Sequence, residues 1–143
     1  MPIQPTTVLD APTTADIGAG LKGKKVLVVD DNFINLDVAV EALTMAGADV
    51  DSTSEGAEAI EMVERNAYDL LLLDLFMPGV DGVDVGHAAR TSGANKNTRM
   101  LIFTASDKAD ANRAMQDLNA NGIVCKPVEI DDLLKKAEAL FQG

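Results

Sequence analysis

Five side chains suited to phosphate or metal chemistry stand where short apolar runs of the sequence end. Asp30 and Asp31 close KVLVVDD, Asp74 closes DLLLLD, Thr104 closes RMLIFT, and Lys126 follows GIVC. If these runs are neighbouring parallel strands, the five side chains meet at the carboxyl edge of one sheet, where open α/β sheets bind their ligands. The sequence therefore predicts a site with three carboxylates, one hydroxyl and one ammonium.

Such a site requires positive charge. Two carboxylates about 5 Å apart repel by roughly 3 kcal/mol at an effective dielectric constant of ~20, and three cannot all stay ionised without compensation. Lys126 offsets one charge, and a divalent cation bound by oxygen ligands, Mg²⁺ or Mn²⁺, offsets two more. We expect phosphoryl transfer, with Asp30 and Asp31 as metal ligands and Asp74, alone at the end of its strand, as the nucleophile.

The elements that must position these groups alternate regularly from Lys24 onward. Short apolar runs of strand length are each followed by an amphipathic stretch of helix length, and there are five such pairs. Strict alternation predicts an α/β fold with a parallel sheet and helices on both faces, because parallel strands need right-handed crossovers. Apart from ADVDS, the runs have continuously apolar interiors, as expected of strands buried on both sides. The strands are predicted at KVLVVDD, ADVDS, DLLLLD, RMLIFT and GIVC.

The first part of the chain has a different composition. Residues 1–22 hold three of the five prolines and show neither helical nor alternating periodicity. We expect a flexible N-terminal tail or linker over residues 1–22 and one domain over residues 23–143.

Composition excludes several function classes. The 143 residues include 23 acidic and 12 basic side chains, and the net charge of -11 disfavours binding to nucleic acid or to an anionic membrane surface. The single cysteine, Cys125, excludes an internal disulfide and is compatible with a reducing compartment; its apolar strand predicts that it is buried. No signal peptide and no apolar run of ~20 residues is visible, so we expect a cytoplasmic protein.

Four motifs together resemble the receiver domain of two-component response regulators and hybrid histidine kinases. They are VLVVDDN, LLLLDLFMPGVDG, IFTAS and KPV, and the resemblance covers about residues 24–141. Their order and consistent spacing make the combination specific. The resemblance implies a flavodoxin-like fold with strand order 2-1-3-4-5. It also implies a histidine kinase or histidine phosphotransfer protein as partner, and an unknown downstream protein.

The resemblance also implies residue roles. Asp74 would accept a phosphoryl group from a phosphohistidine. Asp31, Asp74 and the backbone carbonyl of Phe76 would bind Mg²⁺, with Asp30 assisting through water. Thr104 would hydrogen-bond the phosphoryl oxygens.

Further along the chain, the resemblance implies that Lys126 pairs with those oxygens and that Pro127 follows a cis peptide bond. One departure affects signalling: many receivers carry an aromatic residue three positions before the lysine, where this chain has Ile123. The aromatic part of the conformational switch is therefore missing, and we expect output by another route, through residues 105–109.

Two positions of the family flank the approach of hydrolytic water. Phe76 is bulky and apolar, and Ser106 is neither an acid nor a strong base. We expect the phosphoaspartate to be long-lived.

Alternatives remain open at this stage. One is a receiver-like interaction scaffold that is never phosphorylated. Another is a magnesium-dependent aspartyl phosphatase, although Phe76 stands where such an enzyme needs a second acid. The chain is either a stand-alone receiver, which catalyses only its own phosphorylation and dephosphorylation, or part of a hybrid histidine kinase. Asn32 and Asn35 are similar to hybrid-kinase receivers, but they also suit a helix cap.

Overall fold

Five short segments form one parallel sheet in the order β2-β1-β3-β4-β5. The computed structural model describes residues 19–104, 108–127 and 129–141. Each segment expected to form a strand does so, which confirms the predicted α/β fold. The strand order is the one that the resemblance implies. The strands are β1 Lys25–Val29, β2 Asp49–Thr53, β3 Leu70–Asp74, β4 Arg99–Thr104 and β5 Gly122–Cys125.

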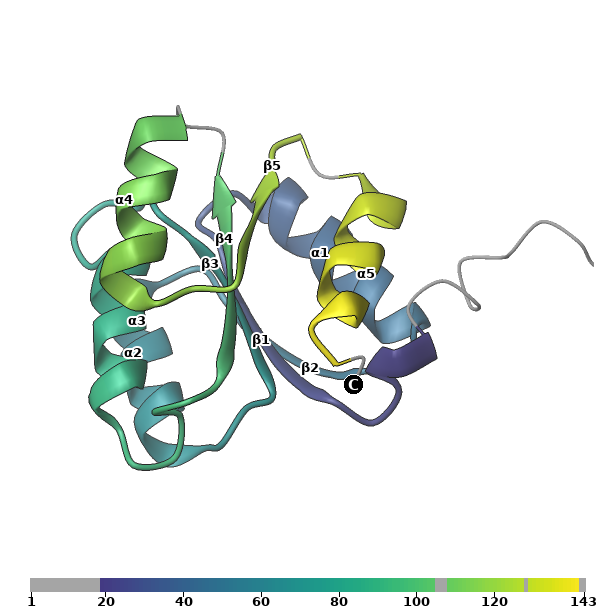
Figure 1. The fold of residues 1–143 in the computed structure, drawn as a ribbon, viewed down its shortest axis with the longest axis horizontal. Coiled ribbons are helices and arrows are strands. Elements are labelled where there is room, and N and C mark those ends of the chain that lie inside the picture. Colours follow the sequence, from purple (N-terminus) through teal and green to yellow (C-terminus); the bar gives the residue numbers. More distant parts are fainter. Residues whose placement is uncertain (1–18, 105–107, 128, 142–143) are drawn as a thin grey trace, which may run out of the picture.

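Helices cover both faces of the sheet. Figure 1 shows α1 and α5 on one face and α2, α3 and α4 on the other. None of the helices in the described part of the chain has the length and apolarity needed to cross a bilayer. The helices are α1 Phe33–Met45, α2 Gly56–Arg65, α3 Gly82–Thr91, α4 Lys108–Leu118 and α5 Ile130–Ala139, preceded by the short 3-10 helix η1 Ala19–Leu21.

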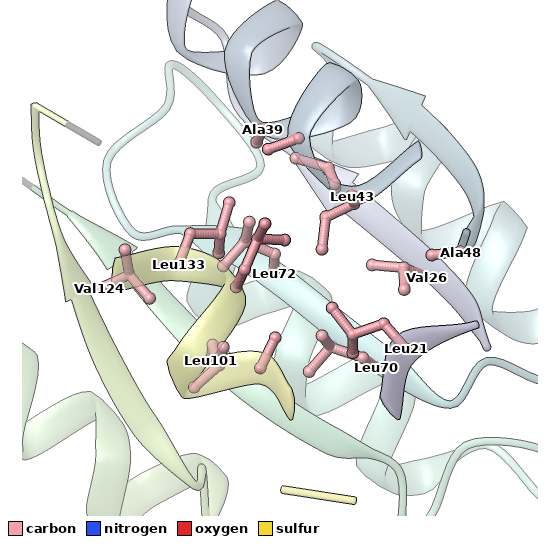
Figure 2. Close-up of a cluster of buried hydrophobic side chains, with 14 of the residues drawn as sticks. Leu21, Val26, Ala39, Leu43, Ala48, Leu70, Leu72, Leu101, Val124 and Leu133 are labelled. Carbon is pink, nitrogen blue, oxygen red and sulfur yellow. The ribbon is translucent and has the colours of Figure 1, made fainter. Parts of the chain in front are cut away.

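The central strand β3 is buried on both faces. Leu70 and Leu72 pack in the cluster beneath α1 and α5, seen in Figure 2, whereas Leu71 and Leu73 pack beneath α2, α3 and α4. All four leucines are fully buried, and each contributes roughly 1.5–3 kcal/mol through apolar burial. This burial holds β3 rigidly in the sheet, so the residue that ends it has a fixed position.

The first helix begins at a side-chain cap. Asn32 is the N-cap residue of α1, and its Oδ1 accepts a hydrogen bond of 3.0 Å from the backbone N–H of Asn35. The cap satisfies one of the helix's unpaired donors. Asn32 therefore has the capping role expected of it, and it directs the chain from the end of β1 into α1.

The helix η1 lies within the segment expected to be a tail. Leu21 is fully buried in the cluster beneath α1 and α5, and the backbone N–H of Gly20 donates to Glu138 Oε2 of α5 at 2.8 Å. Residues 1–18 lie outside the described part of the chain. The predicted boundary after residue 22 stays a prediction, but the packed core includes Leu21.

Two glycines allow backbones to meet beside the end of β3. A Cβ atom on Gly82 would lie 2.0 Å from the carbonyl oxygen of Asp74, and one on Gly56 would lie 2.0 Å from that of Val80. Real Cβ atoms do not approach this closely, so any side chain at either position must displace backbone. The first turns of α3 and α2 therefore rest directly on the β3–α3 connection.

We predict that Gly82→Ala lowers the free energy of unfolding by about 1–3 kcal/mol, because the added methyl group overpacks the end of β3. Gly93→Ala is the matched control: a Cβ there meets no atom within 4 Å, and the change should stay within about 0.5 kcal/mol. Urea unfolding measures both. Equal stability of Gly82→Ala and the wild type would contradict the close contact.

Candidate functional site

Three carboxylates meet at the carboxyl edge of the sheet. Val29 and Leu73 are register partners in β1 and β3, so Asp30 and Asp74, the next residues, lie side by side. One carboxylate oxygen from each of Asp30, Asp31 and Asp74 lies within 4.8 Å of the others. The structure thus brings together the acids that the sequence places at separate strand ends.

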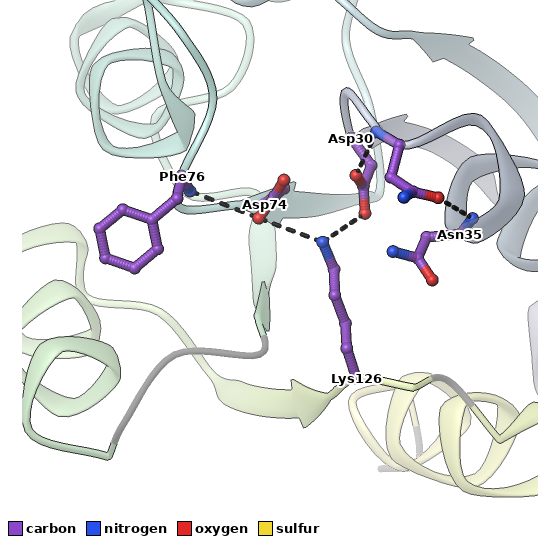
Figure 3. A network of polar contacts seen from close by, with 6 residues as sticks. Asp30, Asn35, Asp74, Phe76 and Lys126 are labelled. Carbon is purple, nitrogen blue, oxygen red and sulfur yellow. Dashed lines mark hydrogen bonds and ion pairs between the residues drawn. The ribbon is translucent and has the colours of Figure 1, made fainter.

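Lys126 supplies the positive charge between two of these acids. Its Nζ lies 2.8 Å from Asp30 Oδ2 and 3.3 Å from Asp74 Oδ1, and Figure 3 shows the ammonium between the two carboxylates. Lys126 follows β5, which is separated from β1 by β4 and β3. The lysine therefore reaches across the sheet edge to make these pairs.

Asp30 has no exposed surface, so its charge needs partners within the protein. Its Oδ1 accepts a hydrogen bond of 2.8 Å from the backbone N–H of Asn32, and its Oδ2 pairs with Lys126. A buried carboxylate that lost either partner would be strongly destabilising. Asp30 thus anchors the lysine, whereas the neighbouring Asp31 is exposed to solvent.

Asp74 is held in a more balanced environment. Burial and the nearby charge of Asp30 raise the pKa of Asp74 to about 6, against the lowering effects of Lys126 and of the Phe76 backbone N–H. That N–H donates to Asp74 Oδ1 at 3.3 Å. The raised pKa reflects a carboxylate that lacks full compensation for its charge and would gain from a further cation.

An open cleft of about 480 Å³ gives access to this group. Thr104, at the end of β4, reaches the cleft although it is only 2% exposed. Asn32 and Asn35 line the cleft but are not among the predicted site residues; their polarity and their place directly after the acids that follow β1 are the signal in the sequence. The cleft is lined by Asp31, Asn32, Asn35, Asp74, Phe76, Thr104 and Lys126.

The charges of the site do not balance by themselves. Three carboxylates and one ammonium leave two negative charges when all are ionised, and the acids present only oxygen donors. Oxygen ligands and a deficit of two charges match a hard divalent cation. The arrangement is therefore an acidic pocket whose charge and oxygen donors suit a hard divalent cation.

The ring of Phe76 borders the cleft without entering the ion-pair network. Its side chain is 56% exposed and extends away from Asp74 in Figure 3. Ser106, the other position expected to flank the approach of water, lies outside the described residues. So do residues 105–107 of the loop expected to carry the output.

Two expectations around β5 have different outcomes, and the structure also places Ile123. The peptide bond between Lys126 and Pro127 is cis, as the resemblance implied. Ile123 is partly buried against the cluster beneath α2, α3 and α4. The expected burial of Cys125 is wrong: its side chain is exposed, at the carboxyl end of β5, which is an edge strand of the described sheet.

The raised pKa of Asp74 predicts a pH-dependent stability. A carboxyl whose pKa rises from 3.8 to about 6 on folding binds its proton more tightly in the folded state. Its contribution to the free energy of unfolding is therefore complete below about pH 4 and is lost as the pH rises through about 6.

Asp74→Asn removes the ionisation and keeps the shape of the side chain. In EDTA near pH 8 we expect the variant to be more stable than the wild type by about 1–3 kcal/mol, and near pH 4 we expect equal stability. Urea unfolding at the two pH values measures the difference. A difference in stability that does not change with pH would contradict the assignment of the raised pKa to Asp74.

Comparison with curated proteins finds bacterial regulatory proteins that are similar in sequence. The response regulator MprA of Mycobacterium leprae is 32% identical over 118 residues, which make up 82% of this chain and 51% of MprA. The transcriptional regulatory protein HprR of Escherichia coli is 30% identical over 115 residues, 80% of this chain and 50% of HprR. The chain thus spans about half the length of the curated relatives it matches.

Solved structures share the fold. Chemotaxis protein CheY4 of Vibrio cholerae matches with a TM-score of 0.77 and 26% identity, covering 82% of this chain and 98% of that one. The receiver domain of a Pseudomonas aeruginosa sensor histidine kinase, determined with a magnesium ion in its active-site cleft, matches with a TM-score of 0.76 over 83% of this chain and 98% of that one. At 24% identity the second likeness shows the fold alone.

The family model of the response regulator receiver domain matches residues 26–138. This range contains all five strands except the first residue of β1, and it contains the three carboxylates, Thr104 and Lys126. The chain therefore belongs to the response regulator receiver domain family.

Proposed function

We propose that this chain is the phosphoacceptor module of a two-component or phosphorelay system, with Asp74 as the phosphorylated residue. The observation that carries the proposal is the position of the Lys126 ammonium, 2.8 Å from Asp30 and 3.3 Å from Asp74. It marks Asp74 as the less tightly paired carboxylate at the base of an open cleft. Asp30 is buried and occupied by its partners, and Asp31 is exposed at the rim.

The proposed reaction is an in-line transfer. A carboxylate oxygen of Asp74 attacks the phosphorus of a phosphohistidine, the P–N bond breaks with its electron pair passing to the imidazole nitrogen, and an acyl phosphate forms. The pKa of about 6 leaves most of Asp74 ionised at neutral pH, which the attack requires. A bound cation would lower that pKa further.

Two side chains would stabilise the transferred group. Thr104 and Lys126 line the same cleft as Asp74. The Thr104 hydroxyl would donate to one phosphoryl oxygen and the Lys126 ammonium would pair with another. Because charge builds up on these oxygens during transfer, preorganised donors lower the barrier.

The metal would be Mg²⁺, with Mn²⁺ as a substitute. Asp31, Asp74 and the backbone carbonyl of Phe76 would hold it, and Asp30, whose oxygens are engaged by Asn32 and Lys126, would act through water. When bound, the ion neutralises charge on the carboxylates and on the phosphoryl group. The case for Mg²⁺ rests on the charges and oxygen donors of this site.

Response regulators interact with histidine kinases and with downstream effectors. For this chain we propose a histidine kinase or histidine phosphotransfer protein as the phosphoryl donor and an unidentified downstream protein as the receiver of the signal. The net charge of -11 argues against direct contact with nucleic acid or an anionic membrane. The single cysteine suits a reducing compartment, so we propose the cytoplasm as its location.

Incubation with Mg²⁺ and acetyl phosphate should add the mass of one phosphoryl group to the intact chain. Mass spectrometry should find the adduct in the wild type and not in Asp74→Ala. Gly93→Ala, a change remote from neighbouring atoms, is the control and should be modified like the wild type. Lys126→Ala should slow the reaction by at least about tenfold, because a charge-stabilising donor is lost.

The same assay separates the alternatives. A receiver-like scaffold would show no adduct with any small phosphodonor or with a phosphorylated partner. A magnesium-dependent phosphatase would turn over the donor many times. The exposed phenyl ring of Phe76 supplies no acid to protonate a leaving group, which favours a single stable modification.

We predict that the phosphoryl group persists for minutes or longer. Phe76 borders the cleft with an apolar ring, so it offers no group to orient or activate an attacking water. Phe76→Glu should hydrolyse several times faster, whereas Phe76→Leu should hydrolyse like the wild type. The measurement is the decay of the phosphorylated mass after the donor is removed, and loss from the wild type within seconds would contradict the prediction.

A further inference from the structure

One aromatic residue belongs to the same row of side chains as the site acids. In β3 and β4, Asp74 and Phe103 are register partners, and Phe103 is in turn the partner of Val124 in β5. Register partners in a parallel sheet point to the same face. Phe103 therefore lies on the strand between Asp74 and the origin of Lys126, on the face covered by α1 and α5.

The ring of Phe103 contacts the lysine. Lys126 Nζ lies over the ring, 5.0 Å from its centroid, within the distance of a cation–π interaction. Phe103 is fully buried, and the Lys126 side chain is 12% exposed. The contact thus occurs where little water competes for the ammonium, which is where such an interaction is strongest.

The contact with the ring restricts the conformation of the Lys126 side chain. Lys126 must extend from β5 over β4 to place its ammonium at the ends of β3 and β1. A lysine stem has about 2 kcal/mol of rotamer entropy to lose when it is held in one conformation. A flat, buried surface beneath the ammonium lowers the number of lysine conformers that compete with the bridging one.

The balance between the two ion pairs shows why the position matters. The distance to Asp30 is 2.8 Å and that to Asp74 is 3.3 Å, so electrostatics alone favours Asp30, which is fully buried. Phe103 lies on β4, on the side of Asp74 that faces away from Asp30, so attraction by its ring opposes a collapse of the ammonium onto Asp30. It keeps the ammonium within reach of Asp74.

We propose that Phe103 is a positioning residue that holds the Lys126 ammonium beside Asp74 through its aromatic face. Its effect on phosphorylation rests on the function proposed above, whereas its effect on the conformation of Lys126 does not. Phe103 acts through Lys126 and is not among the residues that line the cleft.

The first test observes the lysine directly in the metal-free protein by NMR. Protons on the ε carbon of Lys126 should be shifted upfield by the ring current in the wild type, and Phe103→Leu should return them toward ordinary lysine values. Leu101→Val is the matched control, since Leu101 lies two residues earlier on the same strand and in the same cluster. A Lys126 signal that is unshifted in the wild type, or changed equally by Leu101→Val, would overturn the proposal.

The second test measures the rate of phosphorylation by acetyl phosphate with Mg²⁺. Phe103→Leu should slow it about 2- to 30-fold, the range that corresponds to a cation–π contact, while Leu101→Val should change it less than about twofold. Replacing Phe103 by a trifluorinated phenylalanine keeps the ring's shape and weakens its negative face, so an intermediate rate is expected. Equal rates for the fluorinated and natural rings would overturn the aromatic role.

The two tests fail differently. If the wild-type protein is never phosphorylated, the proposed function is wrong and the NMR shift of Lys126 alone decides the role of Phe103. If the wild type is phosphorylated and Phe103→Leu reacts at the wild-type rate, the function stands and the positioning role of Phe103 is wrong.

Discussion

The shared ammonium of Lys126 is the interaction on which the site depends. Asp30 has no exposed surface, and an ionised carboxylate in that position is tolerable only with a close cation and hydrogen-bond donors. Lys126 and the Asn32 N–H provide both. The same lysine lies farther from Asp74 and compensates only part of the charge of that carboxylate. Asp74 therefore has a raised pKa and would gain from a further cation.

The sheet makes this geometry possible. Strand order β2-β1-β3-β4-β5 places the chain after β5 three strands away from β1, so only a long side chain spans the distance. Backbone contacts at Gly82 and Gly56 prevent the connection after β3 from shifting, and the Phe76 N–H within that connection fixes one oxygen of Asp74. Rigid packing thus sets the distances that the chemistry needs.

Much of this arrangement could be predicted from the sequence. Continuous apolar runs such as DLLLLD indicate strands buried on both faces, and the rule that parallel strands present their carboxyl ends to ligands brings Asp30, Asp74 and Lys126 to one edge. Local patterns carry that information. The helix cap at Asn32 can also be predicted locally, because asparagine is a favoured N-cap residue.

Other features depend on tertiary contacts that no local pattern encodes. The buried position of Leu21 follows from docking of η1 on α5, and AGL has too few residues to show a periodicity. Cys125 is exposed at the carboxyl end of β5, an edge strand of the described sheet. The contact of Phe103 with Lys126 depends on the register between strands distant in the chain, and the pKa of Asp74 depends on burial and on Asp30.

The docking of η1 beside the end of α5 fixes where the described chain begins relative to the acidic cleft. Helix α5 runs antiparallel to the strands, so its last turn lies at the edge of the sheet where the strands begin, and Figure 1 shows η1 at the same end of the molecule. The described chain thus enters and leaves at the pole opposite the acidic cleft. The packing of η1 on α5 therefore keeps both elements clear of Asp74 and of the residues that line its cleft.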